Sequence, residues 1–272
     1  MEYAEFLHTV AQFAGDCMSL YWKRSGIEFE LKPDKTPVTQ ADTRIGEYLA
    51  TQFKRCYPNG VCIREETDFP QRLGVGLEGV FDEIDGTAAF AAGRREAVFA
   101  GAILEDHIVQ NMIIHAPLFG SPLTFTAQVG HGAYCNKSRI SVSPQKTGKL
   151  NIVVATASPE PSPNERYHAA PLIAKLKAGG FTVEPMYSSS YSCAKLAQGR
   201  IHGVIFAWDT IHDMAMGHGL VTEAGGVTSD LYGNPLDFGK NKIPGYIMAN
   251  NLDVHRRLRE VVSKHRCQPT PI

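Results

Sequence analysis

Apolar residues recur every three or four positions near the start of the chain. This spacing predicts an amphipathic helix over residues 2–23. A second helix is predicted after the stretch TPVTQAD at 36–42, because Ile45, Leu49 and Phe53 share one face of a helix there. The chain therefore begins with two helices that each have one face to bury.

Short runs of apolar and β-branched residues follow these helices. GVCIRE at 60–65 and EGVFDEI at 78–84 each predict a strand. The stretch at 97–116 has two apolar halves on either side of Glu105 and Asp106, which predicts a hairpin. The stretch at 122–143, with its glycine punctuation, is predicted to add two more strands.

From residue 151 the pattern becomes an alternation of strand and helix. Strands are predicted at NIVVATAS, FTVEPMYSS and HGVIFA, and helices at ERYHAAPLIAKLKAGG, SYSCAKLAQGR and HDMAMGHGLVTEAGG. The polar stretch PQKTGKL at 144–150 is the predicted boundary. The predicted fold class is α/β, with an α+β half over residues 1–146 and an α/β half over residues 147–272.

Acidic residues gather where these elements end. The predicted strand ends carry Glu65, Asp82 and Asp85, while Asp42 and Asp213 lie at helix starts. Carboxylates held close together repel and raise one another's pKa unless a cation neutralises them. Oxygen ligands without His or Cys at ligand spacing favour Mg²⁺ over zinc. Taken singly, each acid has a plainer interpretation as a helix cap or a solvated strand end.

The segment DGTAAFAAG at 85–93 predicts a turn that opens a short helix, with Thr87 near its start. Free backbone N–H groups at such a point form an anion site. An anion site beside a divalent cation indicates a phosphate ester as the ligand. The alternative is a plain Asp-Gly turn capped by Thr87.

A second glycine-rich segment, GVGLEG at 74–79, matches the dinucleotide-binding fingerprint. That fingerprint works only between a strand and a helix, where the pyrophosphate meets the helix N-terminus. No strand is predicted before it and no helix after it. A turn is therefore predicted here, and a nicotinamide enzyme is excluded.

Composition and charge narrow the class of protein. The 272 residues carry a formal net charge of −1 and are 43% hydrophobic, which is typical of a soluble globular protein. Near-neutral charge argues against nucleic acid and membrane surfaces as partners. No apolar run is long enough to span a bilayer, the N-terminus is unlike a secretory signal, and the six cysteines form no CxxC pair. A cytoplasmic protein with reduced thiols is expected.

Three motifs taken together resemble the inositol monophosphatase superfamily of Mg²⁺-dependent, lithium-sensitive phosphatases. They are the glutamate pair at 65–66, DEIDGTAAF at 82–90 and HDMAMGHGLVTEAGG at 212–226. DKTPVTQAD at 34–42 and SSSYSCAKLAQGR at 188–200 are similar to further segments of that family. Nearly the whole chain is covered in order.

The resemblance implies a layered α-β-α-β-α sandwich with a metal site between the two halves. Residues 1–146 would carry most metal ligands, and residues 147–272 would supply the last ligand and the substrate pocket. By position, the ligands of more than one Mg²⁺ ion would be Glu65, Asp82, the Ile84 carbonyl, Asp85 and Asp213.

The resemblance also implies roles for other residues. Gly86 and Thr87 would bind phosphate through backbone N–H groups, with Ser188, Phe206 and Asp213 completing the substrate site. Asp42 and the Thr87 hydroxyl, together with Glu65, would orient and help deprotonate the attacking water.

Several positions depart from the family pattern. Glu83 replaces a proline, Arg64 a glycine and His212 a tryptophan. Arg94 and Arg95 stand where aromatic residues or proline are common. These two arginines could reach an anionic group of the substrate, or could be solvated loop residues. The chain is expected to be a divergent member of the family.

The substrate position offers one further hint. In inositol-specific relatives an acidic residue lies seven positions before the last metal ligand, and here that position is Phe206. An aromatic wall would favour a phosphate ester that carries a ring, such as histidinol phosphate or an adenosine phosphate, over inositol phosphate. The alternative is that Phe206 belongs to the core of a strand and Asp209 supplies the acid.

The predicted function is that of a Mg²⁺-dependent phosphomonoesterase acting on a small phosphorylated metabolite. A homodimer in the cytoplasm is expected, without nucleic acid or membrane as a partner. The alternative is a regulatory or phosphate-ester-binding member of the same fold that does not catalyse hydrolysis.

Overall fold

The fold is described from a computed structural model. It describes residues 1–22, 27–32, 37–67, 75–155, 169–206, 209–240, 242–243 and 245–264. The helices are α1 (Tyr3–Trp22), α2 (Gln40–Cys56), α3 (Thr87–Ala91), α4 (Ala169–Ala178), α5 (Ser189–Ala197), α6 (Ile211–Glu223) and α7 (Leu252–Ser263).

A seven-stranded sheet forms the first β layer. Its strands, in spatial order, are β3 (Val61–Arg64), β4 (Leu77–Asp85), β5 (Val98–Glu105), β6 (Ile108–Ala116), β7 (Leu123–Gln128), β8 (Gly132–Cys135) and β9 (Ser138–Ile140). Only β3 and β4 pair in parallel; every other neighbouring pair in this sheet is antiparallel.

A five-stranded sheet forms the second β layer. Its spatial order is β11 (Phe181–Glu184), β10 (Leu150–Ala155), β12 (Gly203–Phe206), β16 (Tyr246–Ala249) and β14 (Val227–Asp230). Two short ribbons lie apart from the sheets, β1 (Phe29–Leu31) with β2 (Pro37–Thr39), and β13 (Asp209–Thr210) with β15 (Lys242–Ile243).

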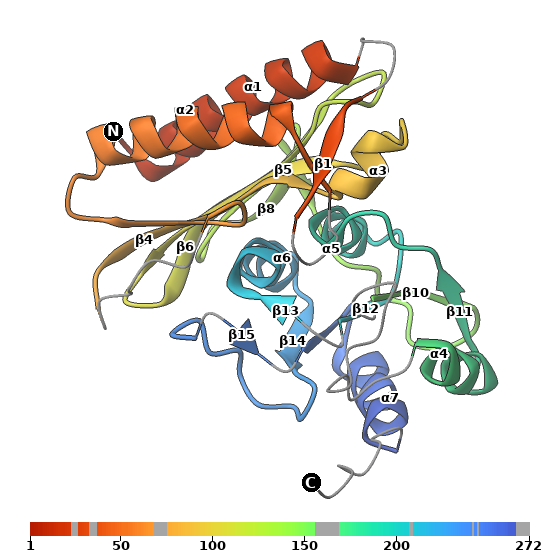
Figure 1. The fold of residues 1–272 in the computed structure, drawn as a ribbon. Coiled ribbons are helices and arrows are strands. Elements are labelled where there is room, and N and C mark those ends of the chain that lie inside the picture. Colours follow the sequence, from red (N-terminus) through yellow and green to blue (C-terminus); the bar gives the residue numbers. More distant parts are fainter. Residues whose placement is uncertain are drawn as a thin grey trace, which may run out of the picture.

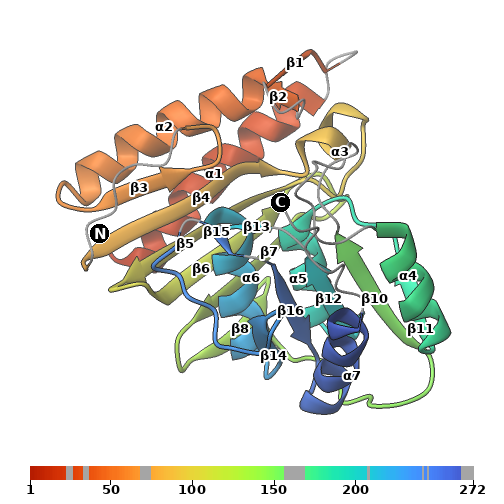
Figure 2. The ribbon, with the colours of Figure 1, turned by 60° about the horizontal axis from the view of Figure 1, so that its bottom comes forward.

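Helices cover both sheets and separate them. α1 and α2 pack on one face of the large sheet, and α5 and α6 lie on its other face against the small sheet (Figure 1). α4 and α7 cover the far face of the small sheet (Figure 2). The predicted α-β-α-β-α sandwich is confirmed.

Three hydrophobic cores match these interfaces. One lies between α1, α2 and the large sheet, and another between the small sheet, α4 and α7. The central core draws side chains from both sheets and from α5 and α6. Residues before and after the predicted boundary at 144–150 therefore contribute to one central core. The acidic residues lie at the edge of this core.

The local predictions agree with the structure where the apolar pattern is clear. The first two helices are α1 and α2, and the hairpin is β5–β6, whose turn contains Asp106 and His107 at positive φ. At the glycine-rich segment, β4 begins at Leu77, so no helix opens there. The five described cysteines are free, and Cys267 lies outside the described residues.

Two predictions were incomplete. The stretch at 122–143 contains three strands rather than two, because β9 follows β8 after a tight turn at Asn136 and Lys137. In the second sheet only β10, β11 and β12 run in parallel, since β16 and β14 join it antiparallel. No helix in the described part of the chain is long and apolar enough to cross a membrane.

Candidate active site

β4 loses its regular register just before it ends. Asp82 pairs with Ala100 and Asp85 with Val98, so three steps along β4 face two steps along β5. In a regular strand, residues three apart point to opposite faces of the sheet. The extra residue of this bulge brings Asp82 and Asp85 onto the same face. Both carboxylates can therefore point towards α6.

Asp213 meets these two aspartates from the first turn of α6. One carboxylate oxygen each of Asp82, Asp85 and Asp213 lies within 4.8 Å of the other two. Asp82 and Asp85 are buried, and about a quarter of the Asp213 side chain is exposed. The fold thus brings together three of the predicted metal ligands from distant parts of the chain.

The environment of the buried pair disfavours negative charge. Burial, followed by the nearby Glu65, Asp85 and Asp213 charges, raises the pKa of Asp82 well above its usual range. Burial and then Asp213 raise the pKa of Asp85. Within the described residues, neither Asp82 nor Asp85 contacts a Lys or Arg, and Asp82 Oδ1 is buried without a hydrogen-bond partner. This set of carboxylate oxygens fits a hard divalent cation such as Mg²⁺.

The start of α5 holds Asp85 in place. The backbone N–H of Ser189 donates to Asp85 Oδ1 at 3.0 Å, its hydroxyl donates to Oδ2 at 2.7 Å, and the N–H of Ser190 also donates to Oδ2. Ser188 is the N-cap of this helix, and its Oγ accepts a hydrogen bond from the N–H of Tyr191. Ser188 was predicted as a substrate-site residue, whereas Ser189 and Ser190 were not. The run of three serines at 188–190 could have indicated them.

The glutamate pair after β3 contacts a cation of the chain itself. Lys32 Nζ lies 3.0 Å from Glu65 Oε1 and 2.9 Å from Glu66 Oε1. Although burial lowers the pKa of Lys32, the two glutamates outweigh it and raise the pKa overall. Glu65 is not one of the three residues whose oxygens cluster. Lys32 was not predicted as a site residue, since a lone lysine in a loop gives no signal.

The side chains of Asp42 and Thr87 each form hydrogen bonds to a residue three positions earlier in the chain. Asp42 Oδ2 accepts from the N–H of Thr39 at 2.8 Å and from its hydroxyl at 2.6 Å, forming the capping box of α2. Asp42 Oδ1 is buried without a partner among the described residues, and burial raises the pKa of Asp42 to about 7. The Thr87 hydroxyl donates to the Ile84 carbonyl at 2.8 Å rather than to Asp42.

Gly86 makes the turn between β4 and α3. Its φ of 89° lies in the left-handed region, and a Cβ there would lie 2.5 Å from the Tyr187 carbonyl oxygen. Glycine is therefore required both by the turn and by the close approach of the segment before α5. At the same place the Arg94 guanidinium lies over the Tyr187 ring, 4.3 Å from its centroid. Arg94 thus contacts Tyr187, and both Arg94 and Arg95 are exposed.

Phe206 lies at the end of β12 in the central core. It is 3% exposed and stacks on Tyr246 with the ring centroids 4.7 Å apart. In this structure the ring presents almost no surface to a ligand, as the core alternative expects. The side chain of Asp209 lies outside the described residues.

Two of the departures from the family pattern form a pair on the opposite face of β4. Arg64 Nη1 lies 3.1 Å from Glu83 Oε1, and Glu83 is fully buried. A Cβ at Gly46 of α2 would lie 2.2 Å from Arg64 Nη1, so this glycine makes room for the pair. Burial raises the pKa of Glu83 to about 8, although Arg64 lowers it. The two residues that depart from the family pattern, Arg64 and Glu83, are therefore ion-pair partners of one another.

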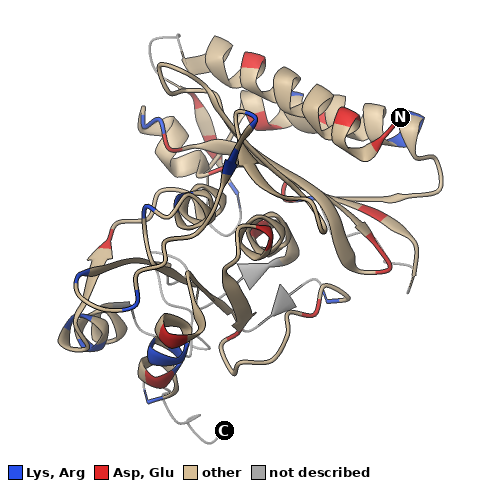
Figure 3. Cartoon of the chain, turned by 180° about the vertical axis from the view of Figure 1, so that it is seen from behind, with Lys and Arg blue, Asp and Glu red and all other residues tan. Residues whose placement is uncertain are grey.

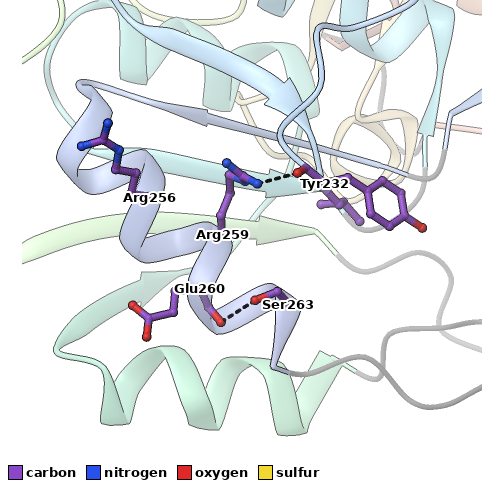
Figure 4. Close-up of a pocket in the computed structure, with 6 residues that line it drawn as sticks. Tyr232, Arg256, Arg259, Glu260 and Ser263 are labelled. Atoms are coloured by element: carbon purple, nitrogen blue, oxygen red, sulfur yellow. Dashed lines mark hydrogen bonds between the residues drawn. The ribbon is translucent and has the colours of Figure 1, made fainter.

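A hollow of about 320 Å³ lies beside α7 (Figure 4), lined by Leu231, Tyr232, Arg256, Arg259, Glu260 and Ser263. Arg259 donates to the Tyr232 carbonyl, and Arg256 points away from both residues. α7 carries three basic positions flanked by two acidic ones, and both colours are seen on this helix (Figure 3). No lining residue of this hollow belongs to the acidic cluster, so the hollow is not assigned to the active site.

Comparison with known proteins covers almost the whole chain. A model of the inositol monophosphatase family matches residues 1–268. The chain is 26% identical over 260 residues to the 3'(2'),5'-bisphosphate nucleotidase CysQ of Aggregatibacter actinomycetemcomitans, covering 90% of this chain and 91% of the relative. It is 27% identical over 233 residues to Nus factor SuhB of Xylella fastidiosa, covering 82% and 80%.

The solved structures extend this likeness to the fold. An IMPase of Thermotoga maritima superposes with a TM-score of 0.83 at 21% sequence identity, over 97% of this chain and 98% of that chain.

Proposed function

Because this chain belongs to the inositol monophosphatase family, we propose that it is a Mg²⁺-dependent phosphomonoesterase acting on a small phosphorylated metabolite. The observation that supports this most directly is the trio of Asp82, Asp85 and Asp213, of which the two buried members contact no Lys or Arg among the described residues. Bound Mg²⁺ would neutralise the phosphate and activate water for attack.

The protein's own residues would hold the cations and the phosphate. Asp82, Asp85, Asp213 and the Ile84 carbonyl would ligate Mg²⁺, and Glu65 would join them when it leaves Lys32. The backbone N–H groups of Gly86 and Thr87 would bind the phosphate oxygens, beside Ser188 at the start of α5. The phosphorus would then be fixed between the end of β4 and the start of α5.

A different set of residues would handle the attacking water. Asp42 is buried with one free carboxylate oxygen, and its pKa of about 7 suits a group that accepts a proton near neutral pH. The Thr87 hydroxyl, now bonded to the Ile84 carbonyl, would orient the water, and Glu65 would lie on its other side. Asp42→Asn and Thr87→Ala should therefore lower kcat more than they weaken Mg²⁺ binding.

The substrate class is a small phosphate ester. The nucleotidase among the relatives is named for a bisphosphate nucleotide, an ester that carries a base, and a ring-bearing substrate is proposed here in preference to inositol phosphate. If the Phe206 ring contributes, it must become exposed, since it is buried in this structure. A cytoplasmic homodimer without nucleic acid or membrane as a partner completes the proposal.

Phosphate release from a panel of esters tests the proposal. The panel should contain inositol, histidinol, adenosine and sugar phosphates, each measured with Mg²⁺ and with a chelator. Hydrolysis that requires Mg²⁺ is expected, with the ring-bearing esters giving the higher kcat/KM. A preference for inositol phosphate would contradict the substrate class, and hydrolysis in the presence of chelator would contradict the metal.

The relative named Nus factor SuhB favours one alternative, a regulatory role without hydrolysis. The acidic trio argues for the enzyme, because a regulatory surface has no need of three neighbouring carboxylates, two of them buried, that repel one another. Absence of phosphate release from the whole panel at saturating Mg²⁺ would favour the regulatory role.

A further inference from the structure

Ser189, the first residue of α5, places its hydroxyl between two of the three aspartates. Its Oγ lies 2.7 Å from Asp85 Oδ2 and 3.1 Å from Asp213 Oδ1. Asp85 ends β4 in the large sheet, whereas Asp213 belongs to the first turn of α6. One buried hydroxyl therefore connects carboxylates that more than a hundred positions of sequence separate.

This hydroxyl is not needed to cap its helix. The cap of α5 is Ser188, whose Oγ accepts from the N–H of Tyr191 at 3.0 Å. The N–H of Ser189 donates to Asp85 Oδ1, independently of its side chain. A buried hydroxyl costs free energy unless it is hydrogen-bonded, and here both of its neighbours are acids of the cluster.

The two contacts of Ser189 differ in kind. A hydroxyl carries one proton, so it can donate to Asp85 or to Asp213 but not to both at once. The remaining contact brings together two oxygens that both carry lone pairs. Such a contact is favourable when a positive centre is shared between them, and a cation bound by the two carboxylates provides one.

We propose that Ser189 is a positioning residue, which holds Asp85 Oδ2 and Asp213 Oδ1 facing one another so that they share a cation. This inference rests on the proposed function, since it takes the acidic trio as the Mg²⁺ site. Loss of the hydroxyl removes this link between Asp85 and Asp213, so that their mutual repulsion is no longer offset by the hydroxyl and their relative orientation is less fixed. Mg²⁺ binding must then reorder the carboxylates, which weakens it.

The chain offers a control in the same helix. Ser192 is also buried, and its Oγ donates to the Ser188 carbonyl at 2.7 Å. Ser192→Ala therefore removes a buried hydroxyl of α5 that bonds to the backbone rather than to an aspartate of the cluster. Ser189→Ala removes the connecting one.

The metal-free protein is titrated with Mg²⁺ alone. Binding is measured by calorimetry and, independently, by the increase in Tm as Mg²⁺ is added. Ser189→Ala should bind Mg²⁺ about tenfold more weakly than the wild type, because loss of a group that orients a metal ligand costs ~10–100-fold. Ser192→Ala should bind as the wild type does. In turnover, Ser189→Ala should need correspondingly more Mg²⁺ for half-maximal rate, and kcat at saturating Mg²⁺ should largely be retained.

Two further variants keep the test open if Ser189→Ala does not fold. Ser189→Thr and Ser189→Val have the same shape and differ only in the hydroxyl, so the threonine variant should bind Mg²⁺ more tightly. A purely structural hydroxyl would change the Tm of the metal-free protein but not the Mg²⁺ titration. Equal or tighter Mg²⁺ binding by Ser189→Ala, or equal binding by Thr and Val, would overturn the role of Ser189 alone. Wild-type protein that binds no Mg²⁺ would overturn the proposed function, and this inference with it.

Discussion

The two faces of β4 near its end carry buried acids in contrasting surroundings. On the face towards α2, Glu83 has the guanidinium of Arg64 at 3.1 Å. On the face towards α6, Asp82 and Asp85 contact no Lys or Arg side chain among the described residues. They lie near a third acid, Asp213. Burial raises the pKa on both faces, but among the described residues only Glu83 has a Lys or Arg in contact with its carboxylate.

Under the proposed function, this difference separates an acid with a structural role from the acids of the metal site. A permanent cation beside Asp82 and Asp85 would make the apo protein more stable and would block the site. Their lack of such a partner leaves room for a cation that arrives from solution, together with its substrate. Glu65 and Glu66 are an intermediate case, because they contact a cation of the protein, Lys32. Under the proposed function, Glu65 would leave Lys32 to bind Mg²⁺.

Asp82→Asn should show the largest effect. The amide has the same shape and cannot serve as an anionic ligand, so phosphate release should fall by more than ~100-fold, beyond the ~10–100-fold cost of losing an outer-shell partner of a metal. The Tm of the metal-free variant should rise, because a buried repelling charge is removed. Phosphate release and Tm, each with Mg²⁺ and with chelator, check both parts. Near wild-type turnover would contradict the site.

Arg64→Met should act on the other face and on stability instead. Leaving Glu83 buried without its partner should lower the free energy of unfolding by ~3 kcal/mol above pH 8, where Glu83 loses its proton, and by less below it. Turnover at saturating Mg²⁺ should largely persist. Urea unfolding on both sides of pH 8 measures this, with Arg95→Met as the exposed control. If Arg64→Met lost activity without losing stability, the Arg64–Glu83 pair would contribute to the active site, contrary to this prediction.

The stability of the metal-free protein should fall as pH rises from the ordinary glutamate pKa of 4.5 towards 8. The folded pKa values of Asp42 and Glu83 are raised to about 7 and about 8, so over this range the folded protein binds more protons than the unfolded chain. Asp82 and Asp85 shift in the same direction. Saturating Mg²⁺ should flatten this slope, as should Asp82→Asn. A slope that does not depend on Mg²⁺ would disagree with a cation at these aspartates.

Lys32→Gln should give the smallest effect. Removing the ammonium frees Glu65 for the cation, so the Mg²⁺ concentration for half-maximal rate should fall by about two- to fivefold, less than ~1 kcal/mol. The control is Lys146→Gln, which removes an exposed ion pair with Asp253. A higher Mg²⁺ requirement would instead show that Lys32 holds Glu65 in position for the metal.

Much of the fold could be predicted because its signals are local. The helical faces of α1 and α2 and the two halves of the β5–β6 hairpin follow from the spacing of apolar residues within each segment. β9 was missed, since only three residues form it, and β14 and β16 were missed because they lie beyond the predicted alternation of strand and helix. In those cases the pairing partner, rather than the segment itself, decides the structure.

The acids of the site were also visible in the sequence, because each ends an apolar run or begins a helix. Their contacts were not. Ser189, from the run of three serines, and Lys32 meet the acids from distant parts of the chain, and no periodic signal says which acid a hydroxyl or ammonium group will contact. Arg64 and Glu83 were visible as two separate departures from a family pattern, and their contact at 3.1 Å turns them into one feature.

By itself, then, the sequence determined which residues are acidic, which segments bury an apolar face, and that Gly86 could make a turn no other residue makes as easily. Only the tertiary structure decided which way those acids point. Asp82 and Asp85, three residues apart, would lie on opposite faces of a regular strand, and the bulge between them turns both towards Asp213. That bulge depends on pairing with β5, a contact between chain segments that no local pattern along either strand records.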